Sequence, residues 1–309
     1  MTSPPQITAL SWLLVGVLGL VWGGTFMVIE IALLGITPFW LAAARISFAA
    51  CLMLAIWSFQ GFKLFATRPD RGTWATTATI GALSAAVPFI LLSWGQQFVT
   101  SGFAGVSMAT VSLIVLPLAH FLVPGERLSP RKVTGFLLGF AGVCVLIGGQ
   151  AFQSSGAQLE IPGRIACMMA ACCYAVSSIL MRRLPAVDPI GLSSVLFLIG
   201  SAIVIPAAFI AEGPPPLPDG QTLLVLAFLG LVPTAAASYL RVIVVRSAGP
   251  VFMSLVGYQV PLWSVILGAL VLGEALPPSL LGALTLILSG VALSQFGAFR
   301  RLVSDVRSR

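Results

Sequence analysis

The sequence predicts an all-α integral membrane protein in which ten transmembrane helices form two inverted five-helix repeats. Of its 309 residues, 58% are hydrophobic and only 8% are charged, whereas about a quarter of the residues in a soluble domain are charged. The apolar residues form continuous runs, unlike the alternating pattern of membrane β-strands. A short motif, G-E-x-L-x-P, also occurs twice, at residues 125–130 and 273–278.

Each predicted helix is an apolar run of roughly 20 residues, the length that crosses the hydrocarbon core of a bilayer. Glycine, proline or charged residues separate the runs. The first repeat is expected to span residues 1–150, with helices over residues 10–34, 38–59, 74–98, 102–123 and 132–149. The second is expected to span residues 151–309 and to end in a basic tail, with helices over residues 162–181, 189–210, 223–245, 251–272 and 279–296.

Basic residues concentrate in alternate loops and in the tail. These are Lys63, Arg68, Arg71, Arg127, Arg131, Lys132, Arg182, Arg183, Arg246, Arg300, Arg301, Arg307 and Arg309. The intervening loops hold only Arg164, together with Glu160, Glu212, Asp219 and Glu274. Short loops rich in Lys and Arg stay in the cytoplasm. The pattern therefore predicts a multi-pass protein of the cell inner membrane with both termini cytoplasmic.

The two copies of the motif are expected on opposite sides of the membrane. Five predicted helices separate them, and an odd number of crossings inverts the second copy. This explains why basic residues surround only the copy at 125–130. Val87-Pro88 and Val232-Pro233, in the third helix of each repeat, are a further internal similarity. Inverted repeats of this kind are typical of alternating-access transporters.

The chain lacks the residue patterns of several other function classes. His120 is its one histidine, which excludes a two-histidine metal site, and no P-loop motif for ATP is present. The five cysteines form no C-x-x-C pair, and the basic residues form no nucleic-acid-binding face. We therefore expect no enzyme activity, cofactor, metal or nucleic acid. The expected partners are the lipid bilayer and a small-molecule substrate; the oligomeric state is open, and a monomer is compatible with the sequence.

Three charged residues within or near the ends of the predicted helices are candidates for function, because a buried charge is costly in a bilayer. Glu30 and Arg45 have similar predicted depths and could form an ion pair between the first two helices. Alternatively, Glu30 binds a substrate amine or a coupling proton, or reaches the lipid interface. Arg241 either extends to the interface or faces the pore to meet a substrate carboxylate.

Aromatic and polar residues gather near the middle of the first, sixth and ninth predicted helices and at the outer end of the third. They predict a pocket for a small, partly apolar solute. The candidate substrate-binding residues are Trp22, Thr25, Trp94, Gln97, Tyr174, Ser178, Tyr258 and Gln259. Trp22, Tyr174, Tyr258 and Gln259 are expected to line one cavity. Ordinary helix packing is the alternative for each of them.

Prolines and glycines inside the helices predict bends and close contacts. Pro88, Pro117, Pro233 and Pro261 each remove a helical hydrogen bond and are candidate hinges, or else static kinks. The spacing of Gly19 and Gly23 allows another helix to approach closely.

Several of these segments resemble those of the EamA-type drug/metabolite transporters. "WGGTF…P…R" in the first two helices, "GQQFVTSG" between the third and fourth, and the loops "GERLSP" and "GEALPP" are similar to motifs of that family in the same order. Trp22 and Arg45 match its opening pattern. The resemblance implies ten helices in two inverted halves, a central cavity and export of small metabolites such as amino acids. The family's aromatic amino acid exporters are the nearest functional analogy.

The expected function is therefore secondary transport of small organic metabolites, with amino acids, aromatic ones included, as exported substrates. One alternative is a multidrug exporter with a looser pocket. Another is a membrane scaffold or sensor that transports nothing, although such a protein does not need an inverted repeat.

The predicted orientation can be tested with single cysteines in an otherwise cysteine-free variant. A cysteine in the loop "EGPPPLPDG" is expected to react with an impermeant thiol reagent in intact cells, because this loop lies outside. A cysteine at Arg182 is expected to be protected until the cells are permeabilised. External labelling at Arg182 would contradict both the orientation and the inversion of the repeats.

Overall fold

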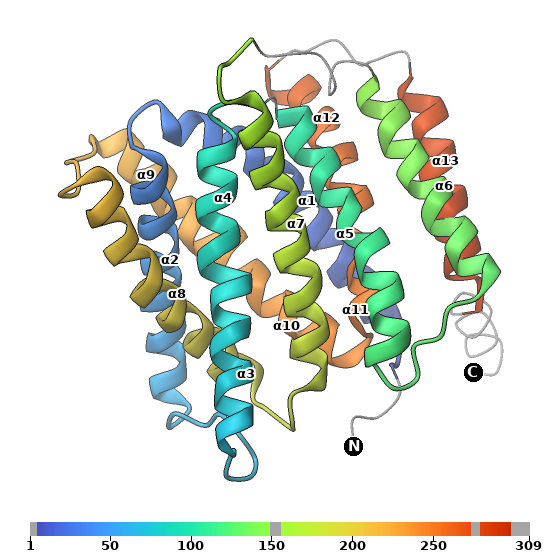
Figure 1. Ribbon diagram of the computed structural model, residues 1–309, viewed down its shortest axis with the longest axis horizontal. Helices are drawn as coiled ribbons and strands as arrows, with labels where there is room; N and C mark the ends of the chain where they lie inside the picture. The colour runs from blue at the N-terminus through green and yellow to red at the C-terminus, as the bar shows by residue number, and fades with distance from the viewer. Residues whose placement is uncertain (1–4, 100, 149–155, 273–278, 298–309) are drawn as a thin grey trace.

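The computed structural model describes residues 5–99, 101–148, 156–272 and 279–297, and these form a bundle of helices (Figure 1). The first half contains α1 (Ala9–Leu33), α2 (Pro38–Phe59), α3 (Arg71–Gly81), η1 (Ala82–Ala86), α4 (Val87–Gly95), α5 (Ser101–Leu122) and α6 (Pro130–Ile147). The second contains α7 (Glu160–Arg183), α8 (Pro189–Glu212), α9 (Gly220–Leu229), η3 (Gly230–Ala236), α10 (Ala237–Ser247), α11 (Pro250–Met253), α12 (Val256–Leu272) and α13 (Leu280–Ser294). The predicted all-α class is confirmed.

Eight helices of the described chain are long and apolar enough to cross a membrane. Two of them, residues 71–95 and 220–247, are continuous helices with π-helical turns at η1 and η3. The other two predicted spans correspond to α6, whose first turn contains Arg131 and Lys132, and to α13, which has 15 residues. A multi-pass membrane protein is thus supported, and the number of ten spans stays a prediction.

Helix packing follows a two-fold relation between the halves. The most extensive contacts of the described residues pair α2 with α8 and α6 with α13, which are the second and fifth helices of each predicted repeat. They also pair α1 with α12 and α5 with α7, so that the first helix of each half packs against the fourth helix of the other. This reciprocal pattern is what inverted repeats produce. The boundary predicted at residues 150 and 151 lies outside the described residues.

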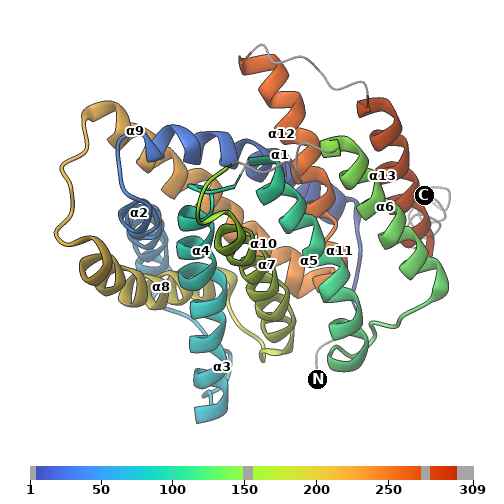
Figure 2. The ribbon, with the colours of Figure 1, turned by 45° about the horizontal axis from the view of Figure 1, so that its top comes forward.

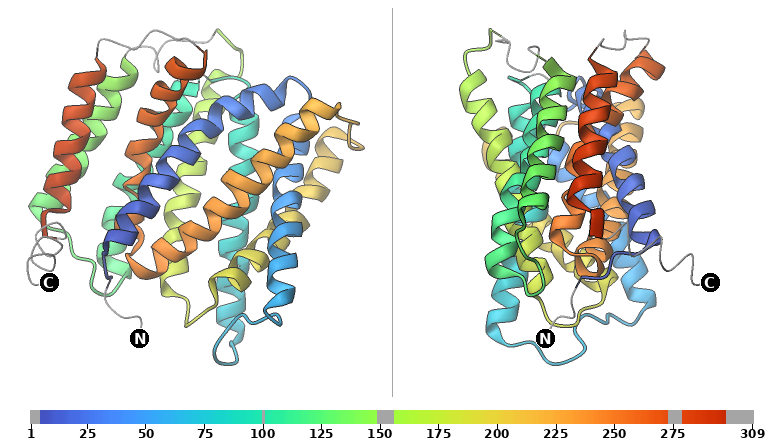
Figure 3. Two further views of the ribbon diagram at one scale, coloured as in Figure 1. Left: turned by 180° about the vertical axis from the view of Figure 1, so that it is seen from behind. Right: turned by 90° about the vertical axis from the view of Figure 1, so that its right-hand side faces the viewer.

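The chain begins and ends its helical part at the same end of the bundle. Figure 3 shows the start of α1 and the end of α13 at the end that also holds the turns after α2, α5 and α7. In or directly beside those turns lie the basic residues Lys63, Arg68, Arg71, Arg127, Arg131, Lys132, Arg182 and Arg183. The side of the membrane that this end faces stays a prediction.

The first copy of the duplicated motif contacts the second half of the chain. Glu126 is buried and forms an ion pair with Lys132, at 3.2 Å between Oε2 and Nζ. A Cβ atom on Gly249, between α10 and α11, would lie 2.7 Å from Glu126 Oε1. Gly249 also has a φ of +94°, which favours glycine. The second copy, residues 273–278, lies outside the described residues.

The ninth predicted helix differs from expectation because a turn divides it into α11 and α12. The Ser254 carbonyl at this turn accepts a hydrogen bond of 2.6 Å from the hydroxyl of Ser112 in α5. A side chain from the other half therefore satisfies a backbone group at the interruption, as burial among helices requires.

Helices α6 and α13 lie side by side at one edge of the bundle, as Figures 1 and 2 both show. Glycines bring their backbones into contact: a Cβ atom on Gly290 would lie 2.5 Å from the Gly135 carbonyl oxygen and from the Gly139 nitrogen. Helices in lipid have no hydrophobic driving force to associate, so close packing of this kind is what holds them together.

Replacing Gly290 by alanine is therefore expected to destabilise the protein, because a methyl group must displace backbone atoms of α6. Overpacking of this kind typically costs about 1–3 kcal/mol. Gly282→Ala in the same helix is the control, since a Cβ atom there meets nothing within 4 Å. Thermal unfolding in detergent measures both variants, and equal melting temperatures would refute the packing role of Gly290.

Candidate functional site

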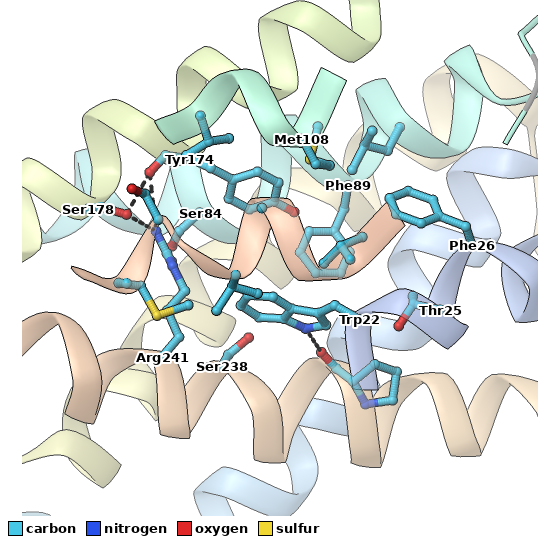
Figure 4. A pocket seen from close by; sticks show the side chains of 18 of the residues that line it. Trp22, Thr25, Phe26, Ser84, Phe89, Met108, Tyr174, Ser178, Ser238 and Arg241 are labelled. Atoms are coloured by element: carbon cyan, nitrogen blue, oxygen red, sulfur yellow. Dashed lines mark hydrogen bonds between the residues drawn. The ribbon is translucent and has the colours of Figure 1, made fainter. Parts of the chain in front are cut away.

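A cavity of about 130 Å³ lies between the two halves of the bundle (Figure 4). We call it the central cavity. Its lining from the first half is Trp22, Thr25, Phe26, Ile29, Arg45, Ser84, Phe89, Leu92, Met108 and Val111. Its lining from the second half is Tyr174, Ser178, Pro233, Ser238, Arg241, Pro250, Met253, Ser254, Val256, Gly257 and Val260.

Aromatic rings from three helices, α1, α4 and α7, surround the central cavity. Figure 4 shows Trp22 near its centre, the ring of Tyr174 on one side, and Phe26 and Phe89 beyond. Trp22 is fixed in place because its indole Nε1–H donates a hydrogen bond of 2.9 Å to the Pro233 carbonyl. The walls can therefore contact an apolar ring from several directions.

The π-helical turn η3 supplies backbone groups to this site. Pro233 has no amide hydrogen, so the Leu229 carbonyl four residues earlier loses its usual helical donor. The hydroxyl of Thr234 donates to that carbonyl instead, at 2.6 Å. The Ala237 amide donates to the carbonyls of Val232 and Thr234 and so leaves the Pro233 carbonyl to Trp22. The irregular turn thus joins α1 to the second half.

Arg45 of α2 is held against the same turn. Its side chain is 5% exposed, and its Nη2 donates a hydrogen bond of 3.3 Å to the Thr234 hydroxyl. The guanidinium carbon lies 4.7 Å from the centre of the Phe89 ring, which is a cation–π distance. The Nε atom is buried without a hydrogen-bond partner among the described residues.

Arg241 of α10 occupies a second part of the lining and is 7% exposed. Its Nη2 donates to the hydroxyls of Ser177 and Ser178 at 2.9 and 2.8 Å. Both hydroxyls in turn donate to the carbonyl of Tyr174. Their oxygens therefore face the guanidinium group, whose carbon lies 5.7 Å from the Tyr174 ring centre. Of the two alternatives for Arg241, the structure shows the one that faces the cavity.

The lining contains two arginines and no Asp or Glu. The two ion pairs that the structure gives for its described residues, Lys132–Glu126 and Arg164–Glu160, lie elsewhere. Water exclusion strengthens electrostatic interactions. The central cavity is therefore a positively charged, aromatic site.

Four of the eight predicted substrate-binding residues come together in the central cavity, namely Trp22, Thr25, Tyr174 and Ser178. Thr25 donates its hydroxyl hydrogen to the Val21 carbonyl within α1, so its oxygen lone pairs are what it can offer to a ligand.

Tyr258 and Gln259 are not in the lining, contrary to prediction. Tyr258 is fully buried and donates its hydroxyl to the Phe136 carbonyl of α6 at 2.9 Å. Gln259 packs against α1, where a Cβ atom on Gly19 would meet its side chain at 2.7 Å. The expected close approach at Gly19 and Gly23 is thus present, and it turns Gln259 away from the cavity.

Trp94 and Gln97 are likewise outside the lining. Trp94 contacts the Phe98 ring at 5.0 Å between ring centres, and Gln97 is exposed. The residues of α4 that line the cavity are Phe89 and Leu92, and Leu92 is two positions before Trp94. Two positions are about 200° of rotation on a helix with 3.6 residues per turn, so Trp94 faces the opposite way.

Glu30 and Arg45 do not share an environment. Arg45 is buried at Thr234 and Phe89, whereas Glu30 is exposed on α1. The depth along the two helices suggested a pair, but α1 directs Phe26 and Ile29, not Glu30, into the cavity. The predicted ion pair between Glu30 and Arg45 is therefore not formed. A role for Glu30 in coupling stays a prediction.

The four candidate hinge prolines occupy different settings. Pro88 is the second residue of α4, which follows the π-helical turn η1, and Pro233 lies within η3. These are the matching Val-Pro positions of the two halves. Pro117 and Pro261 lie inside α5 and α12. Motion at any of the four stays a prediction.

Ser84, Ser238, Phe89 and Met253 line the cavity but were not predicted. The spacing of the sequence could have identified Ser238. Thr234, Ser238 and Arg241 are spaced i, i+4 and i+7, so they share one helix face. Phe89 and Met253 have no such signal, because apolar residues occupy every face of a membrane helix.

The model of the EamA-like transporter family matches this chain twice, at residues 9–148 and 161–296. The chain belongs to the EamA-like transporter family. The two matched segments correspond to the two halves of the bundle, which agrees with the repeat inferred from the duplicated motif.

Named relatives of this EamA-like chain are membrane transporters. An uncharacterized inner membrane transporter, YedA of Escherichia coli K12, is 28% identical over 286 residues, covering 91% of this chain and 89% of that protein. The aromatic amino acid exporter YddG of Ancylobacter novellus is 31% identical over 189 residues, covering 61% of this chain and 64% of that protein. A solved structure described only as "Crystal structure of protein" is 23% identical, with a TM-score of 0.77 over 95% of this chain and 99% of the other, and shows the same fold.

The role of Thr234 can be tested with the nearly isosteric change Thr234→Val. This change is expected to destabilise the protein by about 1–3 kcal/mol, because the Leu229 carbonyl and Arg45 both lose a buried partner. Thr285→Val is the control, since Thr285 is exposed and bonds only the Leu281 carbonyl of its own helix. Unfolding midpoints in detergent provide the comparison; equal effects of the two changes would contradict the proposed network.

Proposed function

We propose that this EamA-family transporter exports small organic metabolites that carry one aromatic ring, aromatic amino acids included, through the central cavity by alternating access. The observation on which the proposal rests is the placement of Trp22, Phe26, Phe89 and Tyr174 around one cavity between the two halves. The name of the relative YddG supports the same substrate class.

The size of the cavity favours a small solute. A volume of about 130 Å³ is close to the roughly 150 Å³ of an engineered cavity that binds benzene. One six-membered ring with a short polar substituent is compatible with this space. A bulky multidrug substrate requires a larger opening, so we place the multidrug alternative second.

The architecture supports alternating access. In transporters with inverted repeats, the solute binds near the midplane where the halves meet, and irregular helix segments line the site. Here the lining comes from both halves, and η3 contributes Pro233 at an interruption of regular helical hydrogen bonding. Bending at η1 and η3 is the motion we propose, because these turns have fewer regular backbone bonds to break.

A scaffold or sensor that transports nothing is the remaining alternative. Such a protein has no need of a polar, arginine-containing cavity at its centre, because buried charges in a bilayer are costly and are usually kept for function.

Transport can be tested in proteoliposomes loaded with labelled phenylalanine or tryptophan. Efflux from liposomes with the wild-type protein is expected to exceed that from empty liposomes. Trp22→Ala and Tyr174→Ala should each weaken substrate binding about two- to tenfold, as an aromatic contact contributes about 0.5–1.5 kcal/mol beyond burial.

Trp94→Ala is the matched control, because Trp94 is an aromatic residue outside the lining. It is expected to leave substrate affinity unchanged. The proposal is wrong if no aromatic solute moves, or if Trp94→Ala reduces affinity as much as Trp22→Ala does.

A further inference from the structure

We propose that Arg45 and Arg241 together bind the carboxylate of the solute, and that the amino group of an amino acid is dispensable, so that aromatic monocarboxylates are substrates of the central cavity. This inference rests on the proposed function and specifies its substrate class. It concerns the charge of the solute, which neither the family nor the cavity size decides.

The first argument is electrostatic. Arg45 and Arg241 are each at least nine-tenths buried, they come from opposite halves of the chain, and both line the same cavity. Their partners among the described residues are neutral: hydroxyl groups, a carbonyl and aromatic rings. A buried charge without a counter-charge is strongly unfavourable. A bound anion would compensate both arginines at once.

The second argument concerns the donors that remain available. A guanidinium group has five N–H donors. The protein uses Nη2 of Arg45 for Thr234, and Nη2 of Arg241 for Ser177 and Ser178. These bonds fix one corner of each guanidinium group. The described part of the chain provides no hydrogen-bond acceptor for Nη1 of either arginine. Carboxylate oxygens are the acceptors that such donors bind best.

The third argument concerns the amino group. An ammonium group buried in a membrane protein is stabilised best by an anionic partner. The lining offers no carboxylate, and its polar groups other than the arginines are the hydroxyls of Ser84, Ser178, Ser238, Ser254, Thr25 and Tyr174. Two arginines in the same space repel a second positive charge. Solutes that are only cationic are therefore excluded, and an α-ammonium group adds nothing that the site requires.

The geometry also orients the solute. Arg241 and Ser178 lie at one end of the labelled group in Figure 4, Phe26 and Thr25 at the other, with Trp22 and Tyr174 between them. Tyr174 is shared by the two functions: its ring forms part of the aromatic wall, and its carbonyl positions the serines that hold Arg241. We place the ring of the solute beside Trp22 and its carboxylate toward Arg241 and Arg45, which line the same cavity.

Four ligands with the same ring test this inference by calorimetry on the purified wild-type protein in detergent at pH 7. They are phenylalanine, 3-phenylpropionate, 2-phenylethylamine and 3-phenylpropanol. We expect 3-phenylpropionate to bind at least as tightly as phenylalanine. We expect the amine and the alcohol to bind roughly 10- to 100-fold more weakly, which is the range for a lost hydrogen bond to a charged group.

The arginines are then changed singly to glutamine, with Arg183→Gln as the control, because Arg183 is an exposed arginine on α7. Arg45→Gln and Arg241→Gln should each remove the advantage of 3-phenylpropionate over 3-phenylpropanol, while Arg183→Gln should preserve it. Arg241→Lys, which retains the charge and loses the fork of donors, should retain part of it. The wild-type ligand series gives an answer even if a glutamine variant does not fold.

The outcomes separate this inference from the proposed function. Binding of all four ligands with similar affinity would support an aromatic site and overturn the carboxylate assignment. Tight binding of phenylalanine without binding of 3-phenylpropionate would overturn it as well, because the amino group would then be essential. Failure of every ligand to bind would refute the proposed function, and this inference with it.

Discussion

The arrangement of the cavity depends on one missing hydrogen-bond donor, the absent amide hydrogen of Pro233. Its absence frees the Leu229 carbonyl, which the Thr234 hydroxyl then satisfies, and the same hydroxyl accepts a bond from Arg45. The shift to π-helical bonding also leaves the Pro233 carbonyl to the indole of Trp22. One interruption in a membrane helix therefore positions an aromatic ring of α1 and a positive charge of α2, because polar backbone groups cannot stay unpaired in lipid.

The two halves share a fold but differ chemically in the cavity. Eight residues after the proline of each Val-Pro pair stand Gln96 in the first half and Arg241 in the second. Gln96 is buried and donates to the Leu92 carbonyl at 3.4 Å, whereas Arg241 lines the cavity. Arg45 is the eighth residue of α2, and the eighth residue of α8 is Leu196. Each half thus contributes one arginine, but from helices that do not correspond in the repeat. The site is therefore asymmetric although the scaffold is symmetric, and it can orient a solute that has one polar end.

Residues that hold the scaffold together are distinct from those that face the cavity, even when they are neighbours. On α12, Gly257 and Val260 line the cavity, Tyr258 reaches the Phe136 carbonyl of α6, and Gln259 packs against Gly19. Adjacent positions on a helix differ by about 100° in direction. A substitution at Tyr258 therefore acts on helix packing, whereas one at Trp22 acts on the solute site, although both are aromatic residues with a polar group.

The sequence by itself determined the membrane class and the duplicated organisation, and it predicted an inverted topology and a depth for each polar residue, because hydropathy, loop charge and the duplicated motif are local properties of the chain. It also predicted Trp22, Tyr174 and the cavity-facing alternative for Arg241. Only the tertiary structure decided which helix face meets the cavity. Rotation about a helix axis is set by neighbouring helices, as at Gly19, and in a helix that is apolar on all sides no periodic pattern reveals it. For this reason Glu30 and Arg45, similar in predicted depth, lie in different environments, and Ser84 and Phe89 became visible as cavity residues only in the folded chain.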